Sequence, residues 1–191
     1  MVRPYNLTDL MDIVKIIRWM MLVVAVVAAV TAGGCLTEGD EPARSLAAGD
    51  RLPDFTVTMA DGEVVSRTSL AGNPGVVVLF STSCSDCREE LPRVQEAADE
   101  CAVAVPDARF ICIAREEDAA SVASYWHEHG LTLPYSPQPD RKVYEIFASS
   151  VIPRLYVFDR KGVITAVYAD DALPSVADIV GAVRKAAATQ P

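Results

Sequence analysis

The chain has 191 residues, of which 51% are hydrophobic and 23% are charged, a composition typical of a globular protein rather than a disordered or fibrous one. Asp and Glu number 26 against 17 Lys and Arg, so the formal net charge is -9. Binding to nucleic acid depends on clustered cations that neutralise phosphates, so this acidic balance argues against a nucleic-acid partner. The length predicts one compact domain.

The apolar segment at residues 19–32 predicts an export signal. It runs for 14 residues without a charge, and Lys15 and Arg18 precede it. A helix that spans a membrane needs about 20 apolar residues, and this segment meets small residues and a cysteine before it reaches that length. A cleaved signal therefore fits the segment better than a permanent span does.

Residues 32–35, with the sequence AGGC, resemble the lipobox of bacterial lipoproteins. In that motif the signal peptidase cuts before the cysteine and the thiol carries diacylglycerol, so the resemblance implies a lipid on Cys35. Ala32 departs from the motif, which usually has leucine at its first position. A conventional signal peptide with an incidental cysteine and an uncleaved amino-terminal anchor are the alternatives.

Export divides the chain into three predicted parts. Residues 1–34 form the signal peptide, which is cleaved before Cys35. Residues 35–50 are mostly small, polar or acidic and show no periodicity, which predicts a flexible tether. Residues 51–191 form the domain, which the lipid would hold at a membrane of the cell envelope, outside the cytoplasm.

Strand patterns open the domain. Residues 54–59 alternate between polar and apolar side chains, and Asp61 and Gly62 form a turn before a second short apolar run, so we expect a β-hairpin. Residues 75–80, with the sequence GVVVLF, are continuously apolar. A short run of this kind is typical of a strand that is buried on both faces.

A cysteine pair follows this buried strand. Cys84 and Cys87 are separated by Ser85 and Asp86. Apolar side chains then recur at spacings of three and four, which predicts an amphipathic helix whose apolar stripe begins at the cysteines. Cys84 is therefore expected at a strand-to-helix junction. The stripe consists of Cys87, Leu91, Val94, Ala98 and Cys101.

The remaining sequence continues to alternate between strand and helix patterns. This order predicts an α/β fold whose sheet is covered by helices on both faces. In chain order, we expect a strand at 109–114, a helix between a cap at Asp118 and an end at Gly130, a short helix near Val143, Ile146 and Phe147, strands at 154–158 and 163–168 joined by a turn at 159–162, and a last helix along 176–183.

The position of the cysteine pair predicts redox chemistry. A thiol at a helix N-terminus faces unpaired backbone N–H groups and the positive end of the helix dipole, which stabilise its thiolate. Cys84 is therefore the better nucleophile. Cys87 lies almost one turn inside the helix, where it can attack a mixed disulfide formed at Cys84. Export supports this interpretation, because disulfides persist outside the cytoplasm.

Other roles for the cysteines fit the sequence less well. A structural zinc site needs four ligands, and the sequence has no second cysteine pair at metal spacing, so no metal site is expected. A purely structural disulfide is uncommon across so short a loop. Cys101 and Cys112 could form a second disulfide, but their spacing does not require one, and Cys112 is expected to be a buried apolar residue.

Two histidines and two aromatic residues lie in the predicted helix before Gly130. His127 and His129 are two positions apart and point to different sides of a helix, so they are not expected to share a metal ion. They are expected to act as favourable cations at the C-terminal end of the helix dipole. Tyr125 and Trp126 are expected in the core.

The two longest motifs together resemble the thioredoxin superfamily, in particular exported, membrane-attached thiol-disulfide oxidoreductases of the TlpA and ResA type. Residues 75–95 (GVVVLFSTSCSDCREELPRVQ) are similar to that family's strand, active-site loop and first helix, including the proline at Pro92. Residues 150–162 are similar to its proline loop, strand and hairpin turn. The resemblance covers roughly residues 50–188. It implies a thioredoxin-like fold, with a central mixed sheet, helices on both faces and an N-terminal β-hairpin extension.

The resemblance implies roles for three further residues. Pro153 matches the cis-proline that lies beside the active-site disulfide, and Ile152 would offer backbone groups to an extended substrate. Glu90 matches a glutamate found three residues after the second cysteine in the ResA type. A shielded Glu90 with a raised pKa could exchange a proton with Cys87, which lies on the same helical face. Alternatively, Glu90 is a solvated helix residue like Glu89.

The sequence also departs from this family. Ser83 replaces a tryptophan found in many relatives, which affects the expected recognition of substrate more than the expected chemistry. Ser85 and Asp86 replace a dipeptide that usually contains proline. An aspartate between the thiols disfavours their thiolates, which would stabilise the disulfide and make the pair a better reductant. The helix dipole acts in the opposite direction.

We therefore expect an extracytoplasmic, lipid-anchored thiol-disulfide oxidoreductase without a cofactor. It would reduce, rather than oxidise, disulfides in exported proteins and take electrons from a membrane thiol donor. A thiol peroxidase of the same broad fold is an alternative, which would need an arginine-supported peroxidatic thiol. A Sco-type copper carrier is a second alternative, although such proteins usually separate their cysteines by three residues and add a histidine, whereas here two residues separate them.

Overall fold

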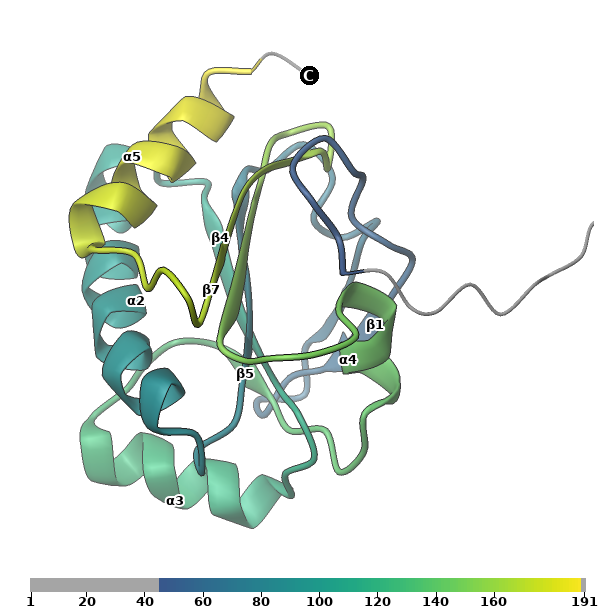
Figure 1. The fold of residues 1–191 in the computed structure, drawn as a ribbon. Coiled ribbons are helices and arrows are strands. Elements are labelled where there is room, and N and C mark those ends of the chain that lie inside the picture. Colours follow the sequence, from purple (N-terminus) through teal and green to yellow (C-terminus); the bar gives the residue numbers. More distant parts are fainter. Residues whose placement is uncertain (1–44, 190–191) are drawn as a thin grey trace, which may run out of the picture. The chain divides into compact units, whose positions relative to one another are not determined.

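The computed structural model describes residues 45–189 (Figure 1). The predicted signal peptide and Cys35 lie outside these residues. Within residues 45–189, no helix has both the length and the apolar character needed to cross a membrane. The elements in chain order are β1 (Thr56–Thr58), β2 (Val64–Ser66), β3 (Gly75–Phe80), α2 (Ser85–Ala104), β4 (Arg109–Ala114), α3 (Ala119–His129), β5 (Tyr135–Ser136), α4 (Lys142–Phe147), β6 (Arg154–Phe158), β7 (Ile164–Ala169) and α5 (Val176–Ala187).

A mixed sheet forms the centre of the domain. Its strand order is β5-β4-β3-β6-β7. Strand β4 is parallel to both β3 and β5, whereas β6 is antiparallel to both β3 and β7. Strands β1 and β2 form a separate antiparallel hairpin. The predicted α/β fold, with a central mixed sheet and an N-terminal hairpin, is therefore confirmed.

The central strands have the bounds that their apolar runs predict. All residues of β3 are buried, because the strand is paired on both sides and lies under helices. Gly75 begins this strand so close to β4 that a Cβ atom there would overlap the carbonyl oxygen of Arg109. Strand β7 begins and ends one residue later than expected. Strand β5 was not expected from the sequence.

Helices lie on both sides of the sheet (Figure 1). Helices α2 and α5 pack side by side on one face. On the other side, α4 lies beside the hairpin, and Phe147 of α4 contacts Phe55 with ring centroids 5.1 Å apart. Helix α3 contacts the sheet through Trp126, which packs against Phe80 and Tyr135. Trp126 and Tyr125 are both buried, so their predicted place in the core is confirmed.

Helix α2 carries the cysteine pair at its first turn. Cys84 is its N-cap, and Pro92 lies inside the helix. Because proline has no N–H, the carbonyl of Arg88 does not receive the usual helical hydrogen bond. The apolar stripe follows the prediction except at Ala98, which is half-buried, whereas its neighbour Ala97 is fully buried. The buried side chains of this helix are Cys87, Glu90, Leu91, Val94, Ala97 and Cys101.

Residues 45–50 of the predicted tether are hydrogen-bonded to the domain. The backbone N–H of Leu46 donates to Phe147 at 2.9 Å, and that of Gly49 donates to Ile164 at 2.8 Å. Ile164 in turn donates to the carbonyl of Asp50 at 2.8 Å. The ordered contacts of the domain therefore begin before residue 51. The rest of the predicted tether lies outside the described residues.

Candidate active site

The loop after β3 places Cys84 at the beginning of α2. The backbone N–H of Cys84 donates to the carbonyl of Ser81 at 3.2 Å, which closes the turn. The backbone N–H of Cys87 donates to the Sγ atom of Cys84 at 3.4 Å, so the sulfur itself caps the helix. Cys84 is partly exposed to solvent. This geometry is the strand-to-helix junction that the sequence predicts.

Cys87 lies behind Cys84 and is fully buried. Burial raises the pKa of the Cys87 thiol well above its ordinary value, and a hydrogen bond with Cys84 raises it further. A backbone hydrogen bond from Ser81 and the charge of Arg115 act in the opposite direction on this pKa. The two thiols therefore differ in access, since solvent reaches only Cys84.

Glu90 is fully buried, whereas Glu89 beside it is exposed. One carboxylate oxygen of Glu90, Oε2, accepts a hydrogen bond from Arg93 at 3.3 Å. The other, Oε1, has no hydrogen-bond partner among the described residues. Burial raises the pKa of Glu90, and Arg93 opposes this shift. Arg93 also pairs with Glu89 at 2.6 Å, so its charge is shared between two carboxylates.

The proline loop lies against Cys84. The peptide bond between Ile152 and Pro153 is cis. The Sγ atom of Cys84 lies 3.6 Å from the carbonyl oxygen of Ile152 and can donate to it. Val151 has a φ of 56°, a left-handed conformation that is unusual for a β-branched residue. The hydroxyl of Tyr144 donates to the carbonyl of Val151 at 3.0 Å and holds this residue in place.

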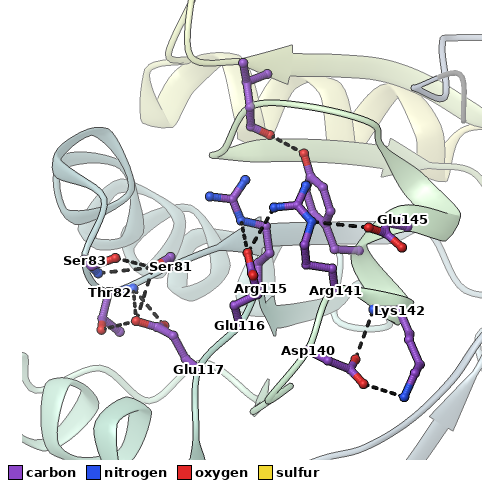
Figure 2. A network of polar contacts seen from close by, with 12 residues as sticks. Ser81, Thr82, Ser83, Arg115, Glu116, Glu117, Asp140, Arg141, Lys142 and Glu145 are labelled. Atoms are coloured by element: carbon purple, nitrogen blue, oxygen red, sulfur yellow. Dashed lines mark hydrogen bonds and ion pairs between the residues drawn. The ribbon is translucent and has the colours of Figure 1, made fainter. Parts of the chain in front are cut away.

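A third segment at the site, residues 115–117, follows β4 and was not expected from the sequence. Figure 2 shows Glu117 pointing at Ser81 and Thr82 in the loop before Cys84. Arg115 lies over the ring of Tyr144, 5.1 Å from its centroid, and so contacts the residue that holds the proline loop. The segment therefore contacts the loop before Cys84 directly, and it reaches the proline loop only through Tyr144 of α4. No motif in the sequence marks it.

The other predicted candidates lie apart from this site. Cys101 and Cys112 are free thiols, and both are buried. His129 stacks on Tyr125 with ring centroids 4.0 Å apart, and both His127 and His129 lie in the last turn of α3 as predicted. In the part of the chain that the structure describes, no group of His, Cys, Asp and Glu side chains could hold a metal ion.

Comparison with known proteins identifies relatives of this chain. A family model described as the AhpC/TSA family matches residues 48–167. The thiol-disulfide oxidoreductase YkuV of Bacillus subtilis (strain 168) is 27% identical, and the alignment covers 58% of this chain and 78% of YkuV. A thiol:disulfide interchange protein of the thioredoxin family from Chlorobium tepidum TLS is 26% identical, with a TM-score of 0.60 over 74% of this chain and 99% of that structure.

A third relative shares the fold at lower sequence identity. It is a secreted disulfide oxidoreductase of Mycobacterium tuberculosis, which is 22% identical with a TM-score of 0.59 over 69% of this chain and 96% of that structure. The family match covers most of the described chain and includes both the cysteine pair and the proline loop. The chain therefore belongs to the AhpC/TSA family and is a thioredoxin-like homologue of thiol-disulfide oxidoreductases.

Proposed function

We propose that this protein reduces disulfide bonds of exported proteins through the Cys84–Cys87 pair. The observation that supports the proposal most directly is the difference in access between the two thiols. Cys84 is partly exposed at the N-terminus of α2, and Cys87 is buried behind it. A substrate disulfide can therefore react first with Cys84, and the buried Cys87 can then attack the mixed disulfide that forms there.

The reaction consists of two thiol-disulfide exchanges. The Cys84 thiolate attacks one sulfur of the substrate disulfide, which forms a mixed disulfide and releases the other substrate sulfur as a thiolate. Cys87 then loses its proton and attacks the Cys84 sulfur, which releases the second substrate thiol and leaves a Cys84–Cys87 disulfide. Two electrons pass to the substrate. A membrane dithiol that becomes oxidised would restore the reduced pair.

Glu90 is proposed to accept the proton that Cys87 must lose. Cys87 requires a base, because burial raises its pKa and keeps its thiol protonated. Glu90 lies three residues later on the same buried face of α2, and its Oε1 atom is free of hydrogen bonds among the described residues. The raised pKa of Glu90 brings its affinity for a proton closer to that of a thiol.

The proposed location is the extracytoplasmic side of a membrane of the cell envelope, with a lipid on Cys35 as the anchor. The apolar segment at 19–32 and the AGGC sequence at 32–35 support this location. The relative from Mycobacterium tuberculosis is described as secreted, which agrees with export. A membrane thiol donor would then be within reach of the anchored domain.

Trapping of mixed disulfides tests the order of attack. The Cys87→Ser variant should accumulate a mixed disulfide with a model disulfide protein through Cys84, since the resolving thiol is missing. The Cys84→Ser variant should trap little, because the Cys87 thiol is buried. Equal trapping by the two variants, read by non-reducing electrophoresis and mass spectrometry, would contradict the division of roles. The reduction potential of the pair tests whether reduction is the favoured direction.

The geometry favours this function over thiol peroxidase activity. A peroxidatic thiol needs the support of an arginine, and the charge of Arg115 acts on Cys87, which is buried and has a raised pKa. Peroxide would have to reach that thiol past Cys84. Consumption of hydrogen peroxide by the reduced protein, at a rate comparable to its exchange with disulfides, would instead identify a peroxidase.

A further inference from the structure

The loop before Cys84 is held by a carboxylate from a distant part of the chain. Both carboxylate oxygens of Glu117 accept the backbone N–H of Thr82, at 2.9 and 2.8 Å. Oε1 of Glu117 also accepts the Thr82 hydroxyl at 2.6 Å and the Ser81 hydroxyl at 3.2 Å. Among the described residues, every hydrogen bond that this side chain accepts comes from Ser81 or Thr82 (Figure 2).

One peptide group connects Glu117 to the reactive cysteine. The Thr82 N–H that donates to Glu117 and the Ser81 carbonyl belong to the same peptide unit. That carbonyl accepts the backbone N–H of Cys84 at 3.2 Å. Hydrogen bonds in such a chain polarise one another, so the carboxylate strengthens the bond that closes the turn at Cys84. Glu117 therefore acts on the backbone of Cys84 without contacting its sulfur.

Arg88 holds the same residue from its other side. Its Nε atom donates to the Thr82 carbonyl at 2.5 Å. Thr82 is thus held by a carboxylate at its N–H and by a guanidinium at its carbonyl, and charge-assisted hydrogen bonds of this kind are stronger than neutral ones. The loop also has an internal bond, from the Ser83 N–H to the Ser81 hydroxyl at 3.2 Å. The backbone that leads into Cys84 is therefore fixed at each peptide group.

We propose that Glu117 is a positioning residue for thiol-disulfide exchange. By fixing the Ser81–Thr82 peptide, it keeps the Cys84 sulfur at the N-terminus of α2, where the Cys87 N–H stabilises its thiolate. The inference rests on the proposed role of Cys84 as the attacking thiol. Glu117 supplies no proton and touches no reacting atom, so its effect is on geometry and on the polarisation of one peptide group.

The experiment compares two matched variants, Glu117→Gln and Glu128→Gln. Glu128 is exposed in α3, where it accepts a hydrogen bond from the Ser124 hydroxyl at 3.3 Å, and it lies outside the loops that flank Cys84. The probe is iodoacetamide, which alkylates the reduced protein and needs no substrate or electron donor. The rate of Cys84 alkylation is followed by mass spectrometry, and the backbone amide signals of Thr82 and Cys84 by NMR. Failure of the proposed reductase activity would leave this assay intact.

We expect Glu117→Gln to slow alkylation of Cys84 by about tenfold. The substitution replaces a charged acceptor by a neutral amide, which weakens the hydrogen bonds from Ser81 and Thr82. The amide protons of both Thr82 and Cys84 should move upfield. Glu128→Gln should change neither the rate nor these signals. Loss of a nearby negative charge would by itself favour the Cys84 thiolate and speed alkylation. A slower rate therefore separates positioning from a direct effect of charge.

Two results would overturn the proposal. One is a Glu117→Gln protein in which the Thr82 amide signal moves while Cys84 keeps its signal and its alkylation rate. The other is faster alkylation. If Glu117→Gln does not fold, Thr82→Val provides the same test, since it removes the 2.6 Å hydroxyl bond and keeps the backbone N–H. Slower alkylation of this variant supports the proposal, and an unchanged or faster rate contradicts it.

Discussion

Replacement of the buried Glu90 by glutamine should change both the free energy of unfolding and the rate of thiol-disulfide exchange. The side chain is fully buried, and Arg93 is its only ion-pair partner among the described residues, at 3.3 Å. Because that guanidinium also binds Glu89 at 2.6 Å, it compensates the Glu90 charge only in part. Burial remains the larger effect, so the pKa of Glu90 is raised in the folded protein. Glutamine has nearly the same shape and carries no charge.

The sign of the stability effect follows from proton binding. Because the folded-state pKa of Glu90 lies above its unfolded value, the folded protein binds more protons than the unfolded chain between these two pKa values. Stability is therefore lost as the pH rises from the unfolded value through the folded one, by about 1.4 kcal/mol per unit of difference. Glu90→Gln removes this loss. The variant should be more stable than the parent at pH 7, as measured by urea unfolding, with less difference at pH 4.

The kinetic effect should have the opposite sign. A general acid or base typically contributes 10²- to 10⁴-fold, but thiol exchange is intrinsically easier, so we expect the exchange rate of Glu90→Gln to fall by about tenfold. Stopped-flow exchange with a model disulfide between pH 4 and 9 measures this change. The inflection that Glu90 contributes to the pH–rate profile should disappear. A variant that is more stable and yet slower cannot be explained by damage to the fold.

The matched control is Glu96→Gln, on the same helix. Glu96 is exposed, whereas Glu89 is an unsuitable control because Arg93 links it to Glu90. Glu96→Gln should keep both the stability and the pH–rate profile of the parent. If Glu90→Gln gives the same two curves as Glu96→Gln, the reasoning is refuted, and Cys87 must lose its proton to water or substrate.

Three further variants test packing and maturation. Gly75→Ala should destabilise the domain by roughly 1–3 kcal/mol or more, because its Cβ would overlap the carbonyl oxygen of Arg109 at the centre of the sheet. Gly181 lies in α5, with open space around the methyl group that alanine would add, so Gly181→Ala should stabilise the domain by about 1 kcal/mol. Urea unfolding should therefore show stability changes of opposite sign for these two glycine variants. Cys35→Ala should leave an unprocessed or mislocalised precursor. Mass spectrometry of the parent protein that finds a mature chain beginning at another residue, with an unmodified Cys35, would exclude the lipid anchor.

The strands at the centre of the sheet could be predicted because a strand that is buried on both faces consists of a continuous run of apolar residues. The apolar runs at 75–80, 109–114 and 154–158 match the observed strands residue by residue. The two-residue strand β5 could not be predicted, since so short a segment has no periodicity. It exists because Tyr135 and Ser136 pair with Cys112 and Ile113 of β4.

The site was only partly predictable for a similar reason. The position of Cys84 follows from a local transition between strand and helix, which the sequence contains. The offset of three from Cys87 puts Glu90 on the same helical face, but the sequence left both a shielded and a solvated Glu90 open. The structure buries Glu90 and exposes Glu89, a difference that arises from packing. Glu117 could not be distinguished from Glu116 in the sequence, because its hydrogen-bond partner Thr82 is 35 residues away along the chain.

Pro92 has a consequence for local unfolding of helix α2. The helix lacks one backbone hydrogen bond, the one that the carbonyl of Arg88 would accept. This carbonyl lies between the turns that carry the cysteines and the turns beside α5 (Figure 1). Opening of the cysteine-bearing turns therefore breaks one bond fewer than in an uninterrupted helix. Backbone amides before Pro92 should exchange with deuterium faster than those after it. The redox pair thus belongs to a part of the helix that can open while the packing of α5 stays intact.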